Sequence, residues 1–138
     1  MMVNDQMPEY CVDRAARVLN ESEKSLKGAD VLVLGVAYKQ DIDDYRESPA
    51  LRVIECLEKR GANVSFYDPW VAEYRYKGDT KQSIPALTEE ALSGADLVMV
   101  TCAHTNVDYD FVQQHAKAIF DTKNAMKGVE VRDNIEVL

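Results

Sequence analysis

The sequence predicts an α/β protein: a doubly wound, mostly parallel sheet with helices on both faces, preceded by an amphipathic helix. Two observations support this fold class. Short apolar runs rich in β-branched residues recur along the 138 residues, and the segments between them carry apolar residues at helical spacing. Strands that alternate with helices form right-handed crossovers and lie parallel in one sheet. Ligands of such sheets bind outside the carboxyl ends of the strands.

The first two predicted elements are a helix and a central strand. Residues 7–27 carry apolar positions near helical spacing, so we expect an amphipathic helix that begins near Pro8 and is stopped by Gly28. Residues 30–37 form a continuous apolar run, which is typical of a strand covered on both faces. Residues 38–47 are too polar for a core and are predicted to form a long surface loop at the carboxyl end of this strand.

The second helix has the clearest signals. Ser48 is a suitable N-cap, Pro49 suits the first helical position and Gly61 supplies a stop. A short strand is expected at residues 63–67. Residues 70–83 are polar, aromatic and turn-rich without a clear period, and they are predicted to form a loop with one helical turn at most.

The last part of the chain repeats the alternation of helix and strand. Thr88 is expected to begin a short helix, because Glu89 and Glu90 would lie in its first turn, where carboxylates favour the helix dipole. The remaining expected elements are strands at 95–101 and 118–121, a helix at 110–115 and a last strand at 136–138.

Composition excludes several classes of function. The chain has 16 Lys and Arg against 24 Asp and Glu, and its net charge of -8 has the wrong sign for binding nucleic acid or an anionic membrane. No apolar stretch is long enough to span a bilayer. Cys11, Cys56 and Cys102 are far apart in the sequence, which predicts neither a disulfide framework nor a zinc site. With no secretory signal at the start, we expect a cytoplasmic setting.

The loop after the first strand is the main candidate site. It does not match the G-x-G-x-x-G turn of dinucleotide-binding proteins, because Gly35 is followed by a long polar segment, so a self-contained dinucleotide site is not expected. Lys39 and Arg46 lie near a helix N-terminus and could hold phosphate. Lys39 would use the compact charge of its ammonium group, and Arg46 would use its planar guanidinium group, which can donate two parallel hydrogen bonds. Alternatively, both cations pair locally with the acids of the loop, which are Asp41, Asp43, Asp44 and Glu47. A Mg²⁺ site made by these acids is the less favoured interpretation.

Other polar residues follow the later strands. Lys123 could add a third phosphate contact, or Asp121 and Asn124 could simply cap the strand end. His104 could contact a ligand or act as a base, although a hydrogen bond to a loop is its more ordinary role.

Cysteine and aromatic residues have ordinary packing roles as their alternative. Core packing is favoured over a nucleophilic role for Cys56 and Cys102. Trp70, Tyr74 and Tyr76 could stack on a base, but anchoring of their loop is the more common function of such residues.

Several separated motifs resemble one known family. They are Val33-Leu34-Gly35-Val36-Ala37-Tyr38-Lys39-Gln40-Asp41, Asp44-x-Arg46-Glu47-Ser48-Pro49-Ala50, Tyr67-Asp68-Pro69 and Phe120-Asp121-Thr122-Lys123-Asn124. In this order they resemble the carboxyl-terminal, UDP-binding, Rossmann-like domain of the nucleotide-sugar 6-dehydrogenases, the UDP-glucose and GDP-mannose dehydrogenase family. Asn4-x-x-Met7-Pro8 resembles the end of the helix that joins the halves of those enzymes and contributes to their dimer contact. The resemblance thus implies an interdomain and dimerisation helix at 1–27 and a UDP-binding domain at 28–138.

The resemblance also implies a function. Family members oxidise C6 of a UDP-sugar in two successive NAD-dependent steps, through a thioester on a cysteine. The NAD-binding domain and that cysteine belong to the amino-terminal part, and no cysteine here lies in the family's Gly-Ser-Cys setting. The chain is therefore expected to bind the UDP-sugar, to depend on an amino-terminal NAD-binding domain as partner, to form a homodimer and to have no turnover alone.

The resemblance assigns roles to four residues. Tyr38 and Lys39 would contact the substrate nucleotide and sugar, and Arg46 would reach the NAD. Lys123 occupies the position of an arginine that binds the UDP in many relatives. The compact ammonium group of lysine therefore stands where those relatives have a planar guanidinium group. The pattern around residues 37–49 is nearer to the UDP-N-acetylglucosamine and UDP-N-acetylmannosamine dehydrogenases than to animal UDP-glucose enzymes. No catalytic or metal-binding residue is expected in this chain.

Two other functions remain as alternatives. A receiver-like signalling module would use strand-end acids, a hydroxyl and a lysine, which Asp43, Asp68, Thr101 and Lys123 partly imitate. In a receiver, however, the acidic pair follows the first strand directly, whereas Asp43 and Asp44 lie well inside the loop of this chain. The second alternative is a pure dimerisation module, whose surface would be the first helix and the aromatic loop.

Overall fold

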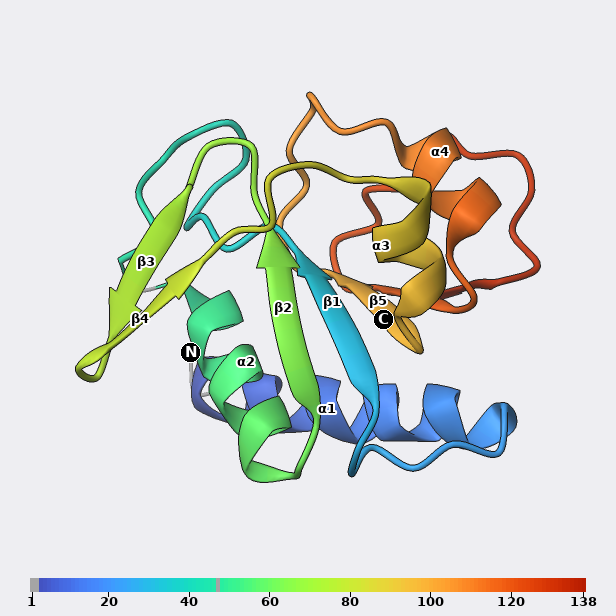
Figure 1. Cartoon of the computed structure of the whole chain (residues 1–138), viewed down its shortest axis with the longest axis horizontal. Helices are drawn as coiled ribbons and strands as arrows, with labels where there is room; N and C mark the ends of the chain where they lie inside the picture. Colours follow the sequence, from blue (N-terminus) through green and yellow to red (C-terminus); the bar gives the residue numbers. More distant parts are fainter. Residues whose placement is uncertain (1–2, 47) are drawn as a thin grey trace.

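The computed structural model describes residues 3–46 and 48–138, with side chains from residue 8 onward. Its centre is a five-stranded sheet in the order β2-β1-β5-β6-β7, in which all neighbours are parallel (Figure 1). The strands are β1 (Asp30–Leu34), β2 (Asn63–Tyr67), β5 (Leu97–Val100), β6 (Ile119–Asp121) and β7 (Ile135–Val137). The predicted α/β class with a parallel sheet is confirmed.

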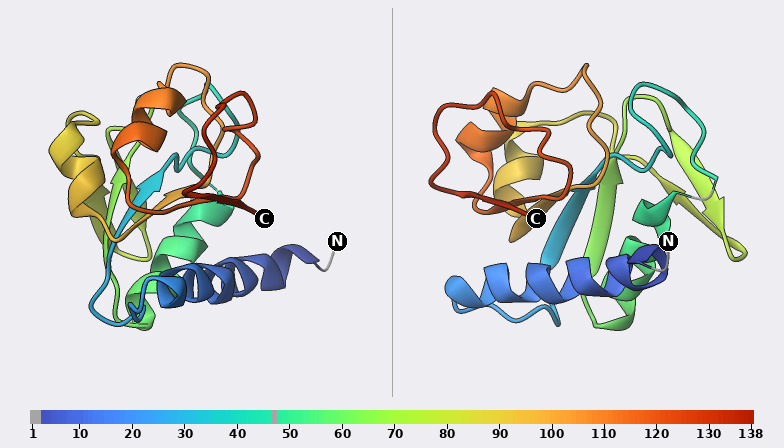
Figure 2. Two further views of the ribbon diagram at one scale, coloured as in Figure 1. Left: turned by 90° about the vertical axis from the view of Figure 1, so that its right-hand side faces the viewer. Right: turned by 180° about the vertical axis from the view of Figure 1, so that it is seen from behind.

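Helices cover both faces of the sheet. The helices α1 (Val3–Glu21) and α2 (Pro49–Lys59) pack on one face, and α3 (Glu89–Gly94) and α4 (Tyr109–His115) pack on the other (Figures 1 and 2). Strand β1 serves both layers, because successive side chains of a strand point to opposite faces. Val31 and Val33 pack in the α1–α2 layer, while Leu32 and Leu34 pack in the α3–α4 layer. This arrangement explains the uninterrupted apolar run in the sequence.

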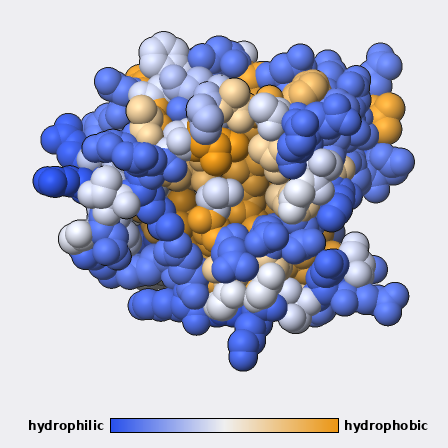
Figure 3. Space-filling view, in the orientation of Figure 1, coloured by the Kyte–Doolittle hydropathy of each residue, from blue (hydrophilic) through white to orange (hydrophobic). Residues whose placement is uncertain are grey.

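The face with α3 is only partly covered. Hydrophobic side chains gather at the centre of this face, over β1 and β2, in a hollow between the α3 side and the hairpin that follows β2 (Figure 3). Tyr67, Ile84 and Leu87 pack there as half-buried residues.

The first helix differs from the prediction at both ends. It begins before Pro8, since a proline inside a helix removes its own N–H donor and does not prevent a turn upstream. It ends at Glu21 rather than near Gly28, because Glu23 adopts a left-handed φ of 61° and the N–H of Lys24 donates to the carbonyl of Leu19 (3.0 Å).

The second helix is as predicted. Ser48 accepts a hydrogen bond from the N–H of Ala50 (3.2 Å), and Pro49 is the first helical residue. Gly61 follows the helix with a left-handed φ of 95°, a conformation that favours glycine.

The prediction of a loop at residues 70–83 is wrong. Strands β3 (Glu73–Tyr76) and β4 (Asp79–Gln82) form an antiparallel hairpin, and Lys77 and Gly78 make its two-residue turn with φ values of 51° and 86°. Two positive φ values are the pattern of the turns that best match strand twist. Tyr74 of this hairpin is buried, and the centre of its ring lies 5.1 Å from the centre of the Phe66 ring.

The shorter elements follow the sequence signals. Thr88 caps α3 by accepting from the N–H of Ala91 (3.1 Å), and Asp108 caps α4 by accepting from the N–H of Phe111 (3.1 Å). Strand β1 stops before the predicted position 37, because Gly35 turns the chain with a φ of 92°. Within the described part of the chain, no helix has the length and apolar character needed to cross a membrane.

Candidate functional site

The loops that follow the parallel strands meet at one edge of the sheet, and Asp68 is the centre of their hydrogen bonding. Its side chain is fully buried, directly after β2. Its carboxylate accepts backbone N–H groups from Val36 (2.8 Å), Ala37 (3.2 Å), Trp70 (2.7 Å) and Val71 (3.1 Å). Burial raises the pKa of Asp68, but these donors and His104 outweigh burial and hold the pKa below its ordinary value.

His104 links Asp68 to the loop after β1. Its Nε2 lies 2.9 Å from Oδ2 of Asp68, and its Nδ1 accepts the backbone N–H of Asp41 at 2.7 Å. Burial lowers the pKa of His104, and its interaction with Asp68 raises that pKa above the ordinary value. Asp68 thus favours the protonated ring, but a proton on Nδ1 would face the N–H of Asp41. The observed contact with Asp41 therefore requires the neutral ring with its proton on Nε2. His104 thus makes the loop hydrogen bond expected of it, and both ring nitrogens are occupied.

Asp41 fixes the turn of the loop. Its backbone is left-handed, with a φ of 61°. Its carboxylate accepts hydrogen bonds from the N–H (2.9 Å) and the hydroxyl (2.7 Å) of Thr105, which lower the pKa of Asp41. Further along, the N–H of Tyr38 donates to the carbonyl of Asp44 (2.7 Å), so the loop is folded back on itself.

Tyr38 and Lys39 lie at the carboxyl end of β1, where the sequence predicts a site. Both side chains are exposed, and 51% of the Tyr38 surface is accessible. An exposed ring next to an exposed ammonium group can contact an anionic ligand that lies on this edge of the sheet.

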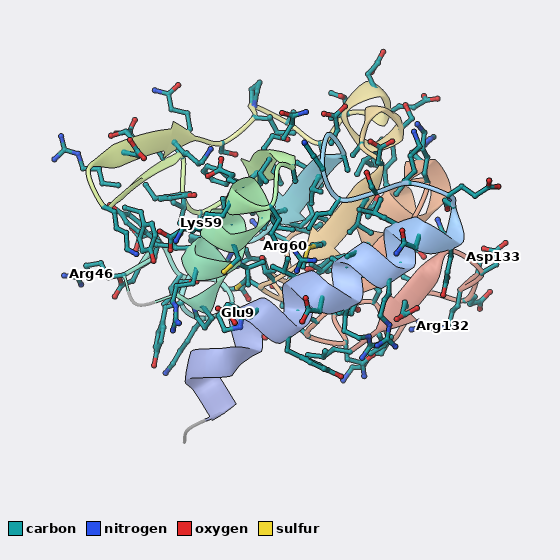
Figure 4. All side chains as sticks on the ribbon, turned by 90° about the horizontal axis from the view of Figure 1, so that it is seen from below. Glu9, Arg46, Lys59, Arg60, Arg132 and Asp133 are labelled. Carbon is teal, nitrogen blue, oxygen red and sulfur yellow. The ribbon has the colours of Figure 1, made fainter. Side chains whose placement is uncertain are left out.

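Arg46 lies on the hairpin side of the same loop and points away from the molecule (Figure 4). Its guanidinium pairs with Asp44, with Nε 3.0 Å from Oδ1, and this pairing lowers the pKa of Asp44. The local ion pair that the sequence allowed is therefore present. Arg46 also lines a cavity of about 510 Å³ together with Arg52, Arg75 and Lys77. An exposed ion pair is weak, so a phosphate group can compete with Asp44 for the guanidinium.

Lys123 lines a different cavity, of about 150 Å³. Cys11 of α1, Pro49 and Ala50 of α2, and Thr101 and Thr122 are among the residues that line it. The first residues of α2 thus contribute to the Lys123 cavity, whereas Ser48 and Leu51 contribute to the Arg46 cavity. The structure therefore places Lys123 and Arg46 in separate cavities beside one helix N-terminus, and Tyr38 and Lys39 line neither of them.

The turn that carries Lys123 is held by Asp121. This buried carboxylate accepts the N–H groups of Lys123 (3.0 Å), Ala125 (3.1 Å) and Met126 (2.8 Å), and Asn124 is left-handed with a φ of 54°. Asp121 and Asn124 therefore have the structural role that the sequence allowed, and they present Lys123 on the surface.

The remaining candidates have structural roles. Asp41 and Asp44 are engaged in the contacts above, Glu47 lies outside the described residues, and no group of acids, cysteines and histidines in residues 3–46 and 48–138 could hold a metal ion. Cys102 is buried in the core and Cys56 is half-buried against it. Tyr74 anchors the hairpin, the Tyr76 hydroxyl donates to Glu55 (3.3 Å), and Trp70 stays 43% exposed.

Sequence reasoning missed the hydrogen-bonding role of Asp68 and of the Asp41–Thr105 pair. Tyr67-Asp68-Pro69 directly after an apolar strand was the available signal for Asp68. No local signal points to the Asp41–Thr105 contact, because 64 positions separate the two residues in the chain.

Known proteins with similar sequences are sugar-nucleotide dehydrogenases. Curated relatives include a UDP-N-acetyl-D-mannosamine dehydrogenase of Methanococcus maripaludis, 31% identical over 134 residues that cover 91% of this chain and 29% of the relative. A UDP-glucose 6-dehydrogenase of Rickettsia bellii is 30% identical over 135 residues, covering 93% of this chain and 30% of that protein.

Solved structures show the same relationship. A UDP-D-ManNAc dehydrogenase of Pyrococcus horikoshii superposes with a TM-score of 0.79 at 26% identity, covering 99% of this chain and 31% of that one. An NDP-N-acetyl-D-galactosaminuronic acid dehydrogenase of Methanosarcina mazei gives a TM-score of 0.78 at 27% identity, covering 99% and 30%. The chain thus spans less than a third of the length of these proteins.

The family model "UDP-glucose/GDP-mannose dehydrogenase family, UDP binding domain" matches residues 32–128. This range contains the loop after β1, the Asp68 turn, His104 and Lys123, and it confirms the resemblance found in the sequence. The chain belongs to the UDP-glucose/GDP-mannose dehydrogenase family and corresponds to its UDP-binding domain.

Proposed function

We propose that this chain is the UDP-sugar-binding part of an NAD-dependent nucleotide-sugar 6-dehydrogenase that converts a UDP-N-acetylhexosamine into its uronic acid. The observation that carries the proposal is the family match across residues 32–128. The names of several similar relatives favour N-acetylmannosamine as the sugar. N-acetylglucosamine and glucose, the latter named for another relative, are the alternatives. Activity requires the amino-terminal half, so the chain alone has no turnover.

Local positive charge supports the binding of a diphosphate. With a net charge of -8, the chain as a whole repels such a ligand, so binding depends on individual cations at the site. Lys39 and Lys123 would supply point charges to the diphosphate, and the exposed ring of Tyr38 would pack against the nucleotide or the sugar.

The turn after β1 does not fit the phosphates of a dinucleotide. The N–H groups of Val36 and Ala37 already donate to Asp68. Gly35 is required for close packing rather than for ligand approach, because a Cβ there would lie 2.5 Å from the Cβ of Cys102. The amino-terminal partner domain would therefore bind most of the NAD.

Arg46 would contact a phosphate of NAD through its planar guanidinium group, which is exposed and pairs with Asp44. When bound, NAD supplies the hydride acceptor for both oxidations. The helix α1 would extend toward the amino-terminal half and contribute to a homodimer, and the enzyme would work in the cytoplasm.

The geometry does not favour a receiver-like module. Asp68 is buried under five hydrogen-bond donors, and the hydroxyl of Thr101 donates to the carbonyls of Leu34 and Gly35. A phosphorylated aspartate needs an accessible carboxylate with Mg²⁺ beside it, so neither side chain is disposed for that chemistry.

Calorimetric titration with UDP tests the proposal, with UMP, ADP and NAD as comparison ligands. We expect selective binding of UDP, weakened by about ten- to a hundredfold in Lys39→Ala and Lys123→Ala, because a charge-assisted contact contributes about 1.5 to 3 kcal/mol. Lys117→Ala is the matched control, since this exposed lysine precedes β6 at the opposite edge of the sheet. Equal affinity for ADP, or wild-type affinity in both site variants, would contradict the assignment.

A further inference from the structure

A closed ring of hydrogen bonds surrounds the loop that carries Tyr38 and Lys39. On one side, Asp68 holds the N–H groups of residues 36 and 37 (2.8 and 3.2 Å). On the other side, His104 holds the N–H of Asp41 (2.7 Å). The ring closes because Nε2 of His104 lies 2.9 Å from the Asp68 carboxylate.

The two members at the centre of this ring are shielded from water. The side chains of Asp68 and His104 are 0% and 1% exposed. Hydrogen bonds in such a setting are costly to break, because the freed groups would stay buried without partners. Asp41 adds a further fixed point, since its left-handed backbone is held by two hydrogen bonds from Thr105 to its carboxylate.

Tyr38 and Lys39 themselves are exposed and cannot be oriented by core packing. Their backbone lies between the anchors at residues 36–37 and 41, so those anchors set the direction in which both side chains leave the sheet. A site with ordered side chains binds more tightly than a mobile one, because less conformational entropy is lost on binding.

We propose that His104 and Asp41 are positioning residues of the UDP-sugar site: together with Asp68 they fix the loop that presents Tyr38 and Lys39 to the ligand. This inference rests on the proposed function of the chain. Neither residue needs to touch the ligand, because each acts through the backbone of the loop.

His104→Phe tests the ring directly. Phenylalanine fills a similar buried volume but neither donates to Asp68 nor accepts from Asp41. Amide hydrogen exchange, followed by NMR on the complete 138-residue chain without ligand, reports the order of the loop. We expect exchange at the Tyr38 amide, which donates to Asp44 in the wild type, to accelerate by about tenfold or more relative to the amides of β1.

Asp41 provides a second test that leaves the core intact. Asparagine and glycine both tolerate the left-handed backbone, so neither substitution introduces strain. Asp41→Asn keeps an oxygen for the N–H of Thr105, and its NH₂ group can donate to the Thr105 hydroxyl, so this variant should remain near wild type. Asp41→Gly loses both side-chain bonds and should accelerate exchange at Tyr38.

Asn134→Ala is the matched control. The Asn134 side chain donates two hydrogen bonds, to the carbonyls of Gln113 and Ala116, near the amino ends of β6 and β7. Its loss should lower Tm without changing loop exchange or UDP affinity. In contrast, His104→Phe and Asp41→Gly should weaken UDP binding by about tenfold, which equals 1.4 kcal/mol.

The outcomes separate the two proposals. Wild-type exchange at Tyr38 in both His104→Phe and Asp41→Gly, or the same acceleration in Asn134→Ala, would overturn the positioning role. Faster exchange with unchanged UDP affinity would also overturn it. A wild-type chain that fails to bind UDP would count against the proposed function, while the ligand-free exchange data would still decide whether the ring orders the loop.

Discussion

Replacing Asp68 by asparagine should destabilise the protein severely, although the two side chains have nearly the same shape. In the wild type, Oδ2 accepts from residues 36, 37 and 104, and Oδ1 accepts from residues 70 and 71. An amide can offer only one oxygen. If that oxygen replaces Oδ2, the new NH₂ group faces the N–H groups of Trp70 and Val71.

The expected loss follows from the two bonds that cannot be kept. Hydrogen bonds to a charged group contribute about 1.5 to 3 kcal/mol each, so Asp68→Asn should lower the free energy of unfolding by about 3 to 6 kcal/mol. A domain of ordinary stability has roughly 5 to 15 kcal/mol in total. We therefore expect a decrease in Tm of about 10 °C or more.

Urea denaturation at pH 7 measures this loss, with Asp43→Asn as the control. Asp43 is an exposed acid of the same loop, so the control makes the same change in net charge without removing a buried acceptor. Asp68→Asn within about 1 kcal/mol of the wild type would refute the reasoning, because the five donors would then not depend on the carboxylate.

The difference between Asp68→Asn and the wild type should also depend on pH. The pKa of Asp68 lies below its ordinary value of 3.8 in the folded protein. The ionised form of Asp68 therefore contributes its full stabilisation at pH values above 3.8. This contribution is lost as the pH falls through the lower pKa that Asp68 has in the folded protein. The gap in stability between wild type and variant should narrow across that acid range and stay constant near neutrality.

Three further substitutions give distinct expected results. Gly35→Ala should prevent normal packing of β1 on β5, because the new Cβ would lie 2.5 Å from the Cβ of Cys102; a circular-dichroism melt at wild-type Tm would contradict this. Ser48→Ala should cost about 1 kcal/mol of unfolding free energy in urea, since it removes the cap of α2, and a cost below about 0.3 kcal/mol would argue against the cap. Lys123→Arg should strengthen UDP binding in calorimetry, because a planar fork replaces a point charge; weaker binding would place the phosphate elsewhere.

Local signals in the sequence were enough for most elements of the fold. The α2 helix was predictable because Ser48 and Pro49 act on the turn that contains them. The hairpin was missed because Lys77, rather than asparagine or aspartate, takes the first left-handed position of its turn. The end of α1 was missed because Leu26 continues the apolar periodicity, although it is buried in a loop beyond the helix.

The edge of the sheet that carries the candidate site could be predicted from the sequence, but the contacts within that site could not. Residues at the ends of parallel strands share one edge, so the regions of Tyr38, Lys39, Arg46 and Lys123 were predictable. The ring formed by Asp41, Asp68 and His104 was not, because its contacts join residues separated by 36 and 63 positions in the chain. Such contacts depend on how loops meet after the sheet has formed.

The three cysteines can report which part of the protein unfolds first, because they lie in different parts of the fold. Cys102 lies against Gly35 in the core and Cys11 is buried on α1, whereas Cys56 on α2 is half-buried. Burial raises the pKa of both Cys11 and Cys56, so their thiols are slow to form the reactive thiolate while the protein is folded. The order in which an alkylating reagent modifies them would therefore distinguish detachment of α1 from unfolding of the whole sheet.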